Sequence, residues 1–305
     1  MLLRLTSRDG LDMGKRTGVT LIELLTVVGV LSIIAALVLP AVHSARESAR
    51  QMSCGNNLHQ IGIAIESFHS KRNQLPIGQF VLSQIAPELE ISTESNPFFG
   101  DQIEVAPSIL RCPSEPVQQL FKGEVNYCMS IGSAIFPLNG AASPVSYDRG
   151  TLSKLSFSDF EDGLSNTALF SEHLQLQVSC ASCPPSTKWW MSPRRFGPGE
   201  ENTMRSFLNQ AVESGSLTPM PNYLHFTNTW VNDDFFYDHL WTPNKAMVIV
   251  LTMGRDAIQP PSSAHRGGVQ LLLADGSVRF ISDQVSDSVW SATGSRNGGE
   301  VNAMD

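Results

Sequence analysis

Residues 19–39 read VTLIELLTVVGVLSIIAALVL and contain one charged side chain, Glu23. An α-helix rises ~1.5 Å per residue, so this stretch predicts a helix of roughly 31 Å, the thickness of the hydrocarbon core of a bilayer. Residues 74–305 hold no second apolar run of that length. We therefore predict that residues 19–39 form a helix that spans a membrane and contacts its lipid.

The residues before this stretch are polar and carry a net positive charge. Their charged side chains are Arg4, Arg8, Asp9, Asp12, Lys15 and Arg16. Positive charge beside a membrane span keeps that end of the chain in the cytoplasm. We expect a single-pass protein of the cytoplasmic membrane, with its N-terminus inside and its C-terminal domain outside.

Two ordinary interpretations of the apolar stretch leave something unexplained. A cleaved secretory signal has an apolar core of about 7 to 15 residues and a small-x-small cleavage site, whereas this core is longer and continues into Pro40-Ala41-Val42-His43. A plain membrane anchor accounts for the length and the orientation. It gives no reason for Glu23, whose burial in lipid costs on the order of 3 kcal/mol.

A third interpretation accounts for Glu23. Lys15-Arg16-Thr17-Gly18 followed by Val19-Thr20-Leu21-Ile22-Glu23 resembles the processing site of type IV prepilins and type II secretion pseudopilins. The resemblance implies that a prepilin peptidase cuts between Gly18 and Val19 and methylates the new amino terminus. Most members of that family have Phe at the first mature position, and Val19 departs from this pattern.

The spacing of Glu23 fits such processing. Cleavage creates an α-amino cation on Val19, and Glu23 lies four residues on, one helical turn away on the same face. A buried carboxylate is tolerated when it is paired, with its own amino terminus or, as the resemblance implies, with that of a neighbouring subunit. Glu23 is therefore expected to set the register of assembly. Gly18, which lacks a Cβ atom, lets the peptidase approach the backbone closely.

The helical pattern continues beyond the apolar stretch. Pro40 is expected to kink the helix or unwind it locally. An apolar stripe then recurs at helical spacing, and Asn73 to Pro76 is a stop signal; the stripe consists of Leu58, Ile61, Ile65 and Phe68. We predict a leader peptide at 1–18, a long helix at 19–73 that becomes amphipathic after residue 39, and an exported α+β globular domain at 74–305.

Short strand signals are scattered through the globular domain. They are Val125 to Ile131, Ala168 to Glu172, Ala246 to Met253, Val269 to Ala274 and Ser277 to Ser282. The last two flank Asp275-Gly276, a dipeptide typical of a type I′ hairpin turn. The expected fold class is α+β and pilin-like, with the long helix packed on a mainly antiparallel sheet.

Several segments together resemble one family. They are Cys54-Gly55-Asn56-Asn57-Leu58-His59-Gln60-Ile61-Gly62, Cys112-Pro113-Ser114, Asp162-Gly163-Leu164-Ser165-Asn166-Thr167 and His265-Arg266-Gly267-Gly268-Val269 to Phe280. These segments look like domain of unknown function family 1559, a pseudopilin-like group with a prepilin-type leader. The resemblance spans nearly the whole chain, and it implies a kinship but no activity.

The five cysteines allow two disulfides in an exported domain. We predict the pairs Cys112 with Cys128 and Cys180 with Cys183, because Cys54 lies on the long helix. The alternative for Cys180 and Cys183 is half of a zinc site. No second C-x-x-C and no H-x(3 to 5)-H follows that pair, so no metal is expected there.

Three other groups of side chains have both a functional and an ordinary interpretation. His265 with Asp275 suggests a hydrolase, but without a G-x-S-x-G motif a turn entering the hairpin is the favoured interpretation. An oxygen-rich set suggests calcium or simple turn chemistry; it comprises Asp159, Asp162, Ser165, Asn166 and Glu172. Aromatic residues are concentrated between Tyr223 and Trp241 and at Trp189-Trp190. They suggest either a binding surface or part of the hydrophobic core, and the core is the favoured interpretation.

The amino-acid composition and the missing motifs argue against several classes of function. The formal charge is −8 with a pI near 5.4, which argues against binding to nucleic acid, because no basic stripe is available for phosphates. Charged residues are 16% of the chain, below the roughly 25% of ordinary soluble domains, as an apolar anchor would make them. No P-loop, G-x-G-x-x-G or H-E-x-x-H motif occurs.

The sequence therefore predicts a structural protein and no enzyme, with no cofactor. It is expected to be a subunit of a type IV pilus-like or type II secretion pseudopilus filament, on the cytoplasmic membrane or at the cell surface. The partners that the resemblance implies are a prepilin peptidase, an assembly platform and other pilin-like subunits. The alternative is a membrane-tethered module outside the cytoplasm that binds a solute or polymer and does not polymerise.

Overall fold

The computed structural model describes residues 20–76, 81–91, 106–115, 124–135, 138–142, 154–175, 189–219, 236–249 and 257–300. The chain forms two compact units, Met1–Arg46 and Glu47–Asp305, which are considered separately below. The sites predicted at Gly18 and Val19, and the predicted pair Cys180–Cys183, lie outside the described residues.

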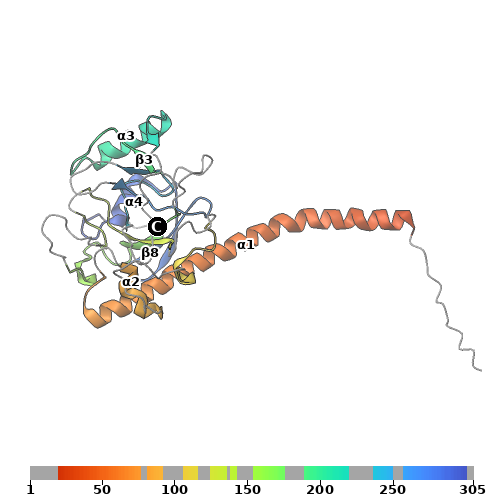
Figure 1. The fold of residues 1–305 in the computed structure, drawn as a ribbon, viewed down its shortest axis with the longest axis horizontal. Coiled ribbons are helices and arrows are strands. Elements are labelled where there is room, and N and C mark those ends of the chain that lie inside the picture. The colour runs from red at the N-terminus through yellow and green to blue at the C-terminus, as the bar shows by residue number, and fades with distance from the viewer. Residues whose placement is uncertain are drawn as a thin grey trace, which may run out of the picture. The chain divides into compact units, whose positions relative to one another are not determined.

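Helix α1 spans Leu21–Arg72 (Figure 1). It confirms the long apolar N-terminal helix that the sequence predicts. The helix continues through Pro40 without interruption, so the local unwinding considered at that proline does not occur. At the C-terminal end Asn73 adopts a left-handed conformation, with φ 52°, and its N–H donates to the carbonyl of His69 at 2.7 Å. This left-handed cap ends the helix where the sequence signals a stop.

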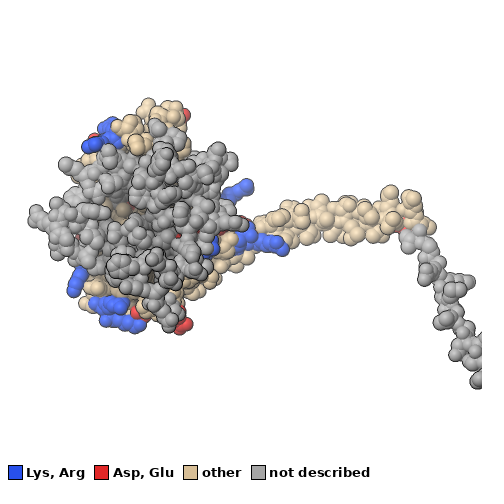
Figure 2. All heavy atoms as spheres, in the orientation of Figure 1, with Lys and Arg blue, Asp and Glu red and all other residues tan. Residues whose placement is uncertain are grey.

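The first unit contributes an exposed apolar helix. The apolar side chains of α1 from Leu21 to Val42 have large exposed fractions, from 41% at Val42 to 80% at Leu21. No charged side chain occurs between Glu23 and Arg46, and Figure 2 shows this part of the helix as an unbroken tan surface. Among the described helices, α1 is the one long and apolar enough to cross a bilayer.

The second unit is built on a five-stranded sheet in the order β5-β1-β2-β8-β9. Its strands are β1 (Tyr127–Ser130), β2 (Ala168–Glu172), β5 (Phe236–Tyr237), β8 (Gly268–Leu273) and β9 (Val278–Ser282). Strands β1 and β5 pair in parallel, and the other three pairs are antiparallel. The α+β class with a mainly antiparallel sheet is therefore confirmed.

The C-terminal half of α1 covers one face of this sheet. Its stripe is almost completely buried, as the 3.6-residue period predicts, and comprises Leu58, Ile61, Ile65 and Phe68. The stripe packs in one core cluster with Tyr127, Met129 and Leu272 of the sheet. Short helices complete that cluster: α2 (Val81–Ile85), η1 (Ala86–Leu89) and η2 (Ser108–Leu110). Helix η3 (Phe157–Asp159) contributes Phe157 at its border.

The opposite face of the sheet has its own core. Val269, Leu271 and Leu273 of β8 point to this side and pack with Trp290 of α4 (Asp287–Gly294). Strand β8 is thus buried on both faces along its whole length. This explains why its sequence is a nearly continuous apolar run and not an alternation.

A second, smaller sheet has the order β4-β3-β6-β7. Its strands are β3 (Trp189–Met191), β4 (Thr218–Pro219), β6 (Met247–Ile249) and β7 (Ala257–Ile258). Helix α3 (Glu201–Glu213) packs in the same core cluster through Met204 and Leu208.

The β8–β9 hairpin lies where the sequence predicts it, but its turn differs. Leu272 pairs with Val278, and the N–H of Leu273 donates to the carbonyl of Ser277 at 2.9 Å, which leaves a loop of Ala274, Asp275 and Gly276. Only Gly276 in this loop has positive φ, +83°. The type I′ prediction is therefore wrong, because that turn needs positive φ at two residues. A three-residue loop with one left-handed glycine takes its place.

Candidate functional site

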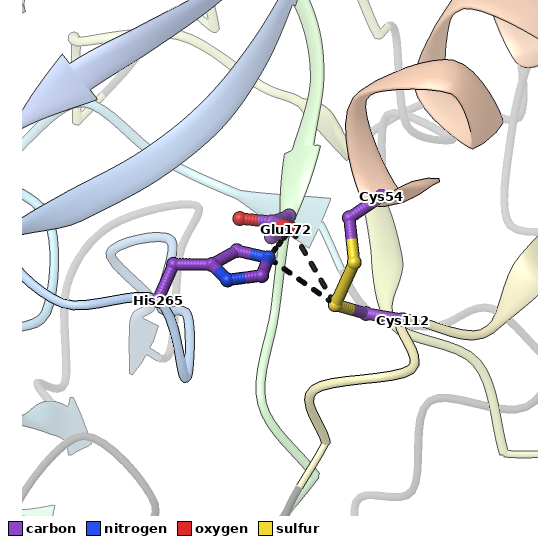
Figure 3. A group of neighbouring side chains, drawn as sticks. All are labelled: Cys54, Cys112, Glu172 and His265. Atoms are coloured by element: carbon purple, nitrogen blue, oxygen red, sulfur yellow. Dashed lines mark hydrogen bonds and ion pairs between the residues drawn. A yellow bond between two sulfur atoms is a disulfide. The ribbon is translucent and has the colours of Figure 1, made fainter. Parts of the chain in front are cut away.

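A disulfide joins α1 to the loop after η2. It links Cys54 to Cys112, with 5.2 Å between the two Cα atoms (Figure 3). The predicted pair Cys112–Cys128 is wrong, and the sheet gives the reason. Cys128 alternates along β1 with Tyr127 and Met129, so its buried thiol faces the core on the other side of the sheet.

His265 lies beside this disulfide. Its side chain is 2% exposed, and its Nε2 atom lies 3.5 Å from Sγ of Cys112 and 3.3 Å from Oε1 of Glu172 (Figure 3). Its Nδ1 atom lies 2.7 Å from Oε1 of Glu47. The imidazole is thus held between two carboxylates, one from β2 and one from α1.

Both carboxylates are themselves held in place. Oε2 of Glu172 accepts the backbone N–H of Gln270 at 2.9 Å, and Oε1 lies 3.7 Å from Sγ of Cys112. Glu47 accepts from Nε of Arg50 at 2.9 Å and from the hydroxyl of Ser114 at 3.2 Å. Glu172 is the last residue of β2, so the strand end and the helix jointly fix the position of His265.

The charges determine the protonation of this group. Burial by itself lowers the pKa of His265, but the hydrogen bonds and attraction of Glu172 and then Glu47 outweigh it, so that pKa lies above its usual 6.5. Burial raises the pKa of Glu47, but hydrogen bonds from His265 and Arg50 outweigh it and place that pKa below 4.5. Glu172 and Glu47 therefore favour the protonated imidazole of His265, and Arg50 pairs with the outer carboxylate, Glu47.

The loop of the β8–β9 hairpin also contacts α1. Nδ1 of His59 lies 3.1 Å from the carbonyl oxygen of Gly276. Gly62 lies one helical turn after His59 on α1. A Cβ atom added to Gly62 would lie 3.0 Å from Cδ1 of Leu272 and 3.7 Å from the Cα atom of Gly276. The helix therefore approaches the hairpin closely because residue 62 has no side chain.

A family model matches most of this chain. The model, described as a protein of unknown function (DUF1559) and abbreviated SBP_bac_10, matches residues 43–90 and 87–288. The chain belongs to this family. The resemblance drawn from the sequence motifs is therefore confirmed. The DUF1559 match covers the disulfide, His265 and both carboxylates, whereas the exposed apolar residues 21–42 precede it. No curated protein and no solved structure matches the chain.

The structure separates the two residues of the suggested hydrolase. His265 and Asp275 lie at opposite ends of β8, and Asp275 accepts the N–H of Ser277 at 2.9 Å within the hairpin loop. The imidazole of His265 instead contacts residues of α1 and β2.

The oxygen-rich calcium candidates are likewise used separately. Asp159 accepts the N–H of Ser156 at 2.7 Å, and Asp162 accepts the N–H groups of Gly298 and Gly299. Glu172 belongs to the His265 group. The carboxylates thus satisfy backbone groups, which is the turn chemistry that the sequence offered as the alternative.

The described part of the aromatic stretch lies in the core. Phe236, Tyr237 and Trp241 are buried, with His239 and Asp238 between them, and Trp190 packs at the border of a core cluster. Residues 220–235 lie outside the described residues. The core interpretation holds for the residues from 236 to 241.

Glu23 has a role that the sequence interpretation missed. Its Oε2 atom accepts the backbone N–H of Thr20 at 2.8 Å and the hydroxyl of Thr20 at 2.7 Å. The N–H of Glu23 in turn donates to the hydroxyl of Thr20 at 3.4 Å. This reciprocal pair is a capping box, and the spacing Thr-x-x-Glu before an apolar run was its visible signal.

Proposed function

We propose that this DUF1559 protein is a prepilin-like structural subunit and not an enzyme. A prepilin peptidase removes residues 1–18 by cutting after Gly18, and the mature chain assembles into a type IV pilus-like or type II secretion pseudopilus filament. Its partners are the peptidase, an assembly platform and other pilin-like subunits. Before assembly it resides in the cytoplasmic membrane with its C-terminal domain outside.

The observation that carries this proposal is the exposed apolar helix. From Leu21 to Val42 the large apolar side chains of α1 are exposed, and such a surface requires cover by lipid or by other apolar helices. A filament core made of similar helices provides that cover once the subunit leaves the membrane. The Lys15-Arg16-Thr17-Gly18 segment in front of the helix supplies the signal for the transfer.

Glu23 distinguishes a filament subunit from a plain anchor. An anchor gains nothing from a carboxylate in lipid, whereas a subunit uses it to pair with the amino terminus of a neighbour. The capping box is compatible with this role, because Thr20 engages one carboxylate oxygen of Glu23, Oε2. It also offers a purely local reason for the carboxylate, so an experiment must separate the two.

Two substitutions separate a role of Glu23 in assembly from its local role in helix capping. Thr20→Ala removes the capping hydroxyl, at a cost of about 1 kcal/mol in helix stability, but keeps the carboxylate. Glu23→Ala removes the charge and the two contacts of Oε2 with Thr20, and keeps the backbone N–H that donates to the Thr20 hydroxyl. We expect Glu23→Ala to be inserted and processed but absent from sheared filaments, and Thr20→Ala to be incorporated. If the two variants behave alike, Glu23 has no specific role in assembly.

The tethered binding module remains the competing function. Its strongest sequence feature was the aromatic stretch, and the part of that stretch from Phe236 to Trp241 is buried. Exchanging residues 19–39 for an unrelated membrane span tests the choice: a binding module keeps its role, whereas a filament subunit no longer assembles.

A further inference from the structure

The disulfide and the His265 group together have the geometry of a metal centre. Cys54, Cys112, Glu172 and His265 are all buried, and each offers one ligand atom within 4.8 Å of the others (Figure 3). Two sulfurs, one imidazole nitrogen and one carboxylate oxygen are a ligand set that zinc prefers.

Three of the six distances between the ligand atoms match the edges of a tetrahedral zinc site. Zinc bonds of about 2.3 Å to sulfur and about 2.0 to 2.2 Å to nitrogen and oxygen imply tetrahedral edges of about 3.6 Å for S–N, about 3.6 Å for S–O and about 3.4 Å for N–O. The structure has 3.5 Å from Cys112 Sγ to His265 Nε2, 3.7 Å from Cys112 Sγ to Glu172 Oε1, and 3.3 Å between Nε2 and Oε1. Three edges of the tetrahedron are therefore already present.

Hydrogen bonds from neighbouring groups orient His265 and Glu172, as they orient the ligands of a metal site. Metal-ligating histidines usually donate their second ring N–H to a carboxylate, and ligating carboxylates are themselves hydrogen-bonded. Nδ1 of His265 is held by Glu47 at 2.7 Å, which leaves Nε2 facing the sulfur. Oε2 of Glu172 is held by the N–H of Gln270, which leaves Oε1 facing the same point.

We propose that Cys54, Cys112, His265 and Glu172 bind one zinc ion when the two cysteines are reduced, and that the disulfide and the metal are alternative states of this site. A dithiol reductant supplies two electrons and two protons, which break the S–S bond and leave two thiols while the dithiol becomes a disulfide. Zinc then displaces the two thiol protons to solvent, and with them any proton on Nε2 of His265. Either state fixes α1 to the loop after η2 and to β2.

A narrow recess borders the site. A recess of about 170 Å³, counting its open mouth, is lined by Cys112, Glu172, His173 and Ser262. It borders two of the four ligands, Cys112 and Glu172.

Cobalt(II) titration of the full-length chain in detergent tests the proposal, because Co²⁺ substitutes for zinc and reports tetrahedral thiolate ligation by its visible bands. The background is Cys180→Ser with Cys183→Ser, which removes the other C-x-x-C pair. We expect the dithiol-reduced chain to bind one Co²⁺, displaced by one Zn²⁺, with release of protons. The oxidised chain should bind at least 100-fold more weakly.

Matched variants locate the ligands. Cys54→Ser and His265→Gln should abolish the tetrahedral spectrum, while Cys128→Ala, which removes a buried thiol outside the group, should retain it. Circular dichroism establishes that each variant is folded. The proposal is overturned if the reduced parent chain does not bind, if oxidation leaves binding unchanged, if Cys54→Ser still binds, or if Cys128→Ala does not.

Discussion

His265 and Glu47 are 218 residues apart in the sequence, yet Nδ1 of His265 lies 2.7 Å from Oε1 of Glu47. This contact ties the segment before β8 to α1. At the other end of β8, the carbonyl of Gly276 meets His59 of the same helix. The helix and the strand are therefore fastened to one another at two points, with the Cys54–Cys112 disulfide between them along α1.

The first prediction concerns pH. Because Glu172 and Glu47 raise the pKa of His265 above 6.5, its protonated form stabilises the fold. This contribution is complete below pH 6.5 and is lost as the pH rises through the raised pKa. We expect the melting temperature of the wild type to fall over that range relative to His265→Gln. A difference between the two that does not change with pH contradicts this account.

His265 should also matter for overall stability below pH 6.5. Replacing it by Ala leaves the buried Glu172 carboxylate without its ion-pair partner, which costs about 3 to 5 kcal/mol in comparable buried pairs. Replacing Glu172 by Gln at the same time removes that uncompensated charge. Chemical unfolding should therefore show the double variant to be more stable than His265→Ala alone, and the reverse order would refute the importance of the pair.

The disulfide should be a major support of the second unit. It closes a loop with a sequence separation of 58 residues, and the chain-entropy model gives about 4 kcal/mol for a loop of this size. Cys54→Ser, measured with a metal chelator present, should lower the free energy of unfolding by an amount of that order. The control Cys128→Ala removes a buried sulfur and leaves the disulfide intact. Equal losses in the two variants would show that burial of sulfur, and not the cross-link, is responsible.

Close packing at Gly62 gives a further prediction. A side chain there meets Leu272 at 3.0 Å, whereas Gly29, also within α1, has no atom within 4 Å of an added Cβ. Gly62→Leu should destabilise the fold by about 1 to 3 kcal/mol through overpacking. Gly29→Leu should not lower the melting temperature of the monomer in detergent, and comparable destabilisation by both changes would exclude the proposed contact.

Much of the fold was predicted from local sequence patterns, because helices and turns depend mainly on residues that are close together in the chain. The stripe from Leu58 to Phe68 follows from helical periodicity alone, and Asp275-Gly276 marks the hairpin. The turn type was wrong because it depends on the pairing register of Leu272 with Val278, which a dipeptide does not specify.

The candidate site required information that no local pattern carries. The sequence alone allows Cys128 to pair with Cys112. The structure excludes this pair, because β1 directs the side chain of Cys128 to the opposite face of the sheet. The contacts of His265 with Glu47 and Glu172 cross 218 and 93 residues of sequence. The family resemblance named segments that contain His265 and both disulfide cysteines, but it did not say that these residues meet.

Mass spectrometry of the N-terminus of native protein tests the central claim most directly. The proposed processing predicts a chain that begins at Val19, carries a methyl group on its α-amino nitrogen and lacks residues 1–18. A native chain that still begins at Met1, or that is cut at another bond, would contradict it.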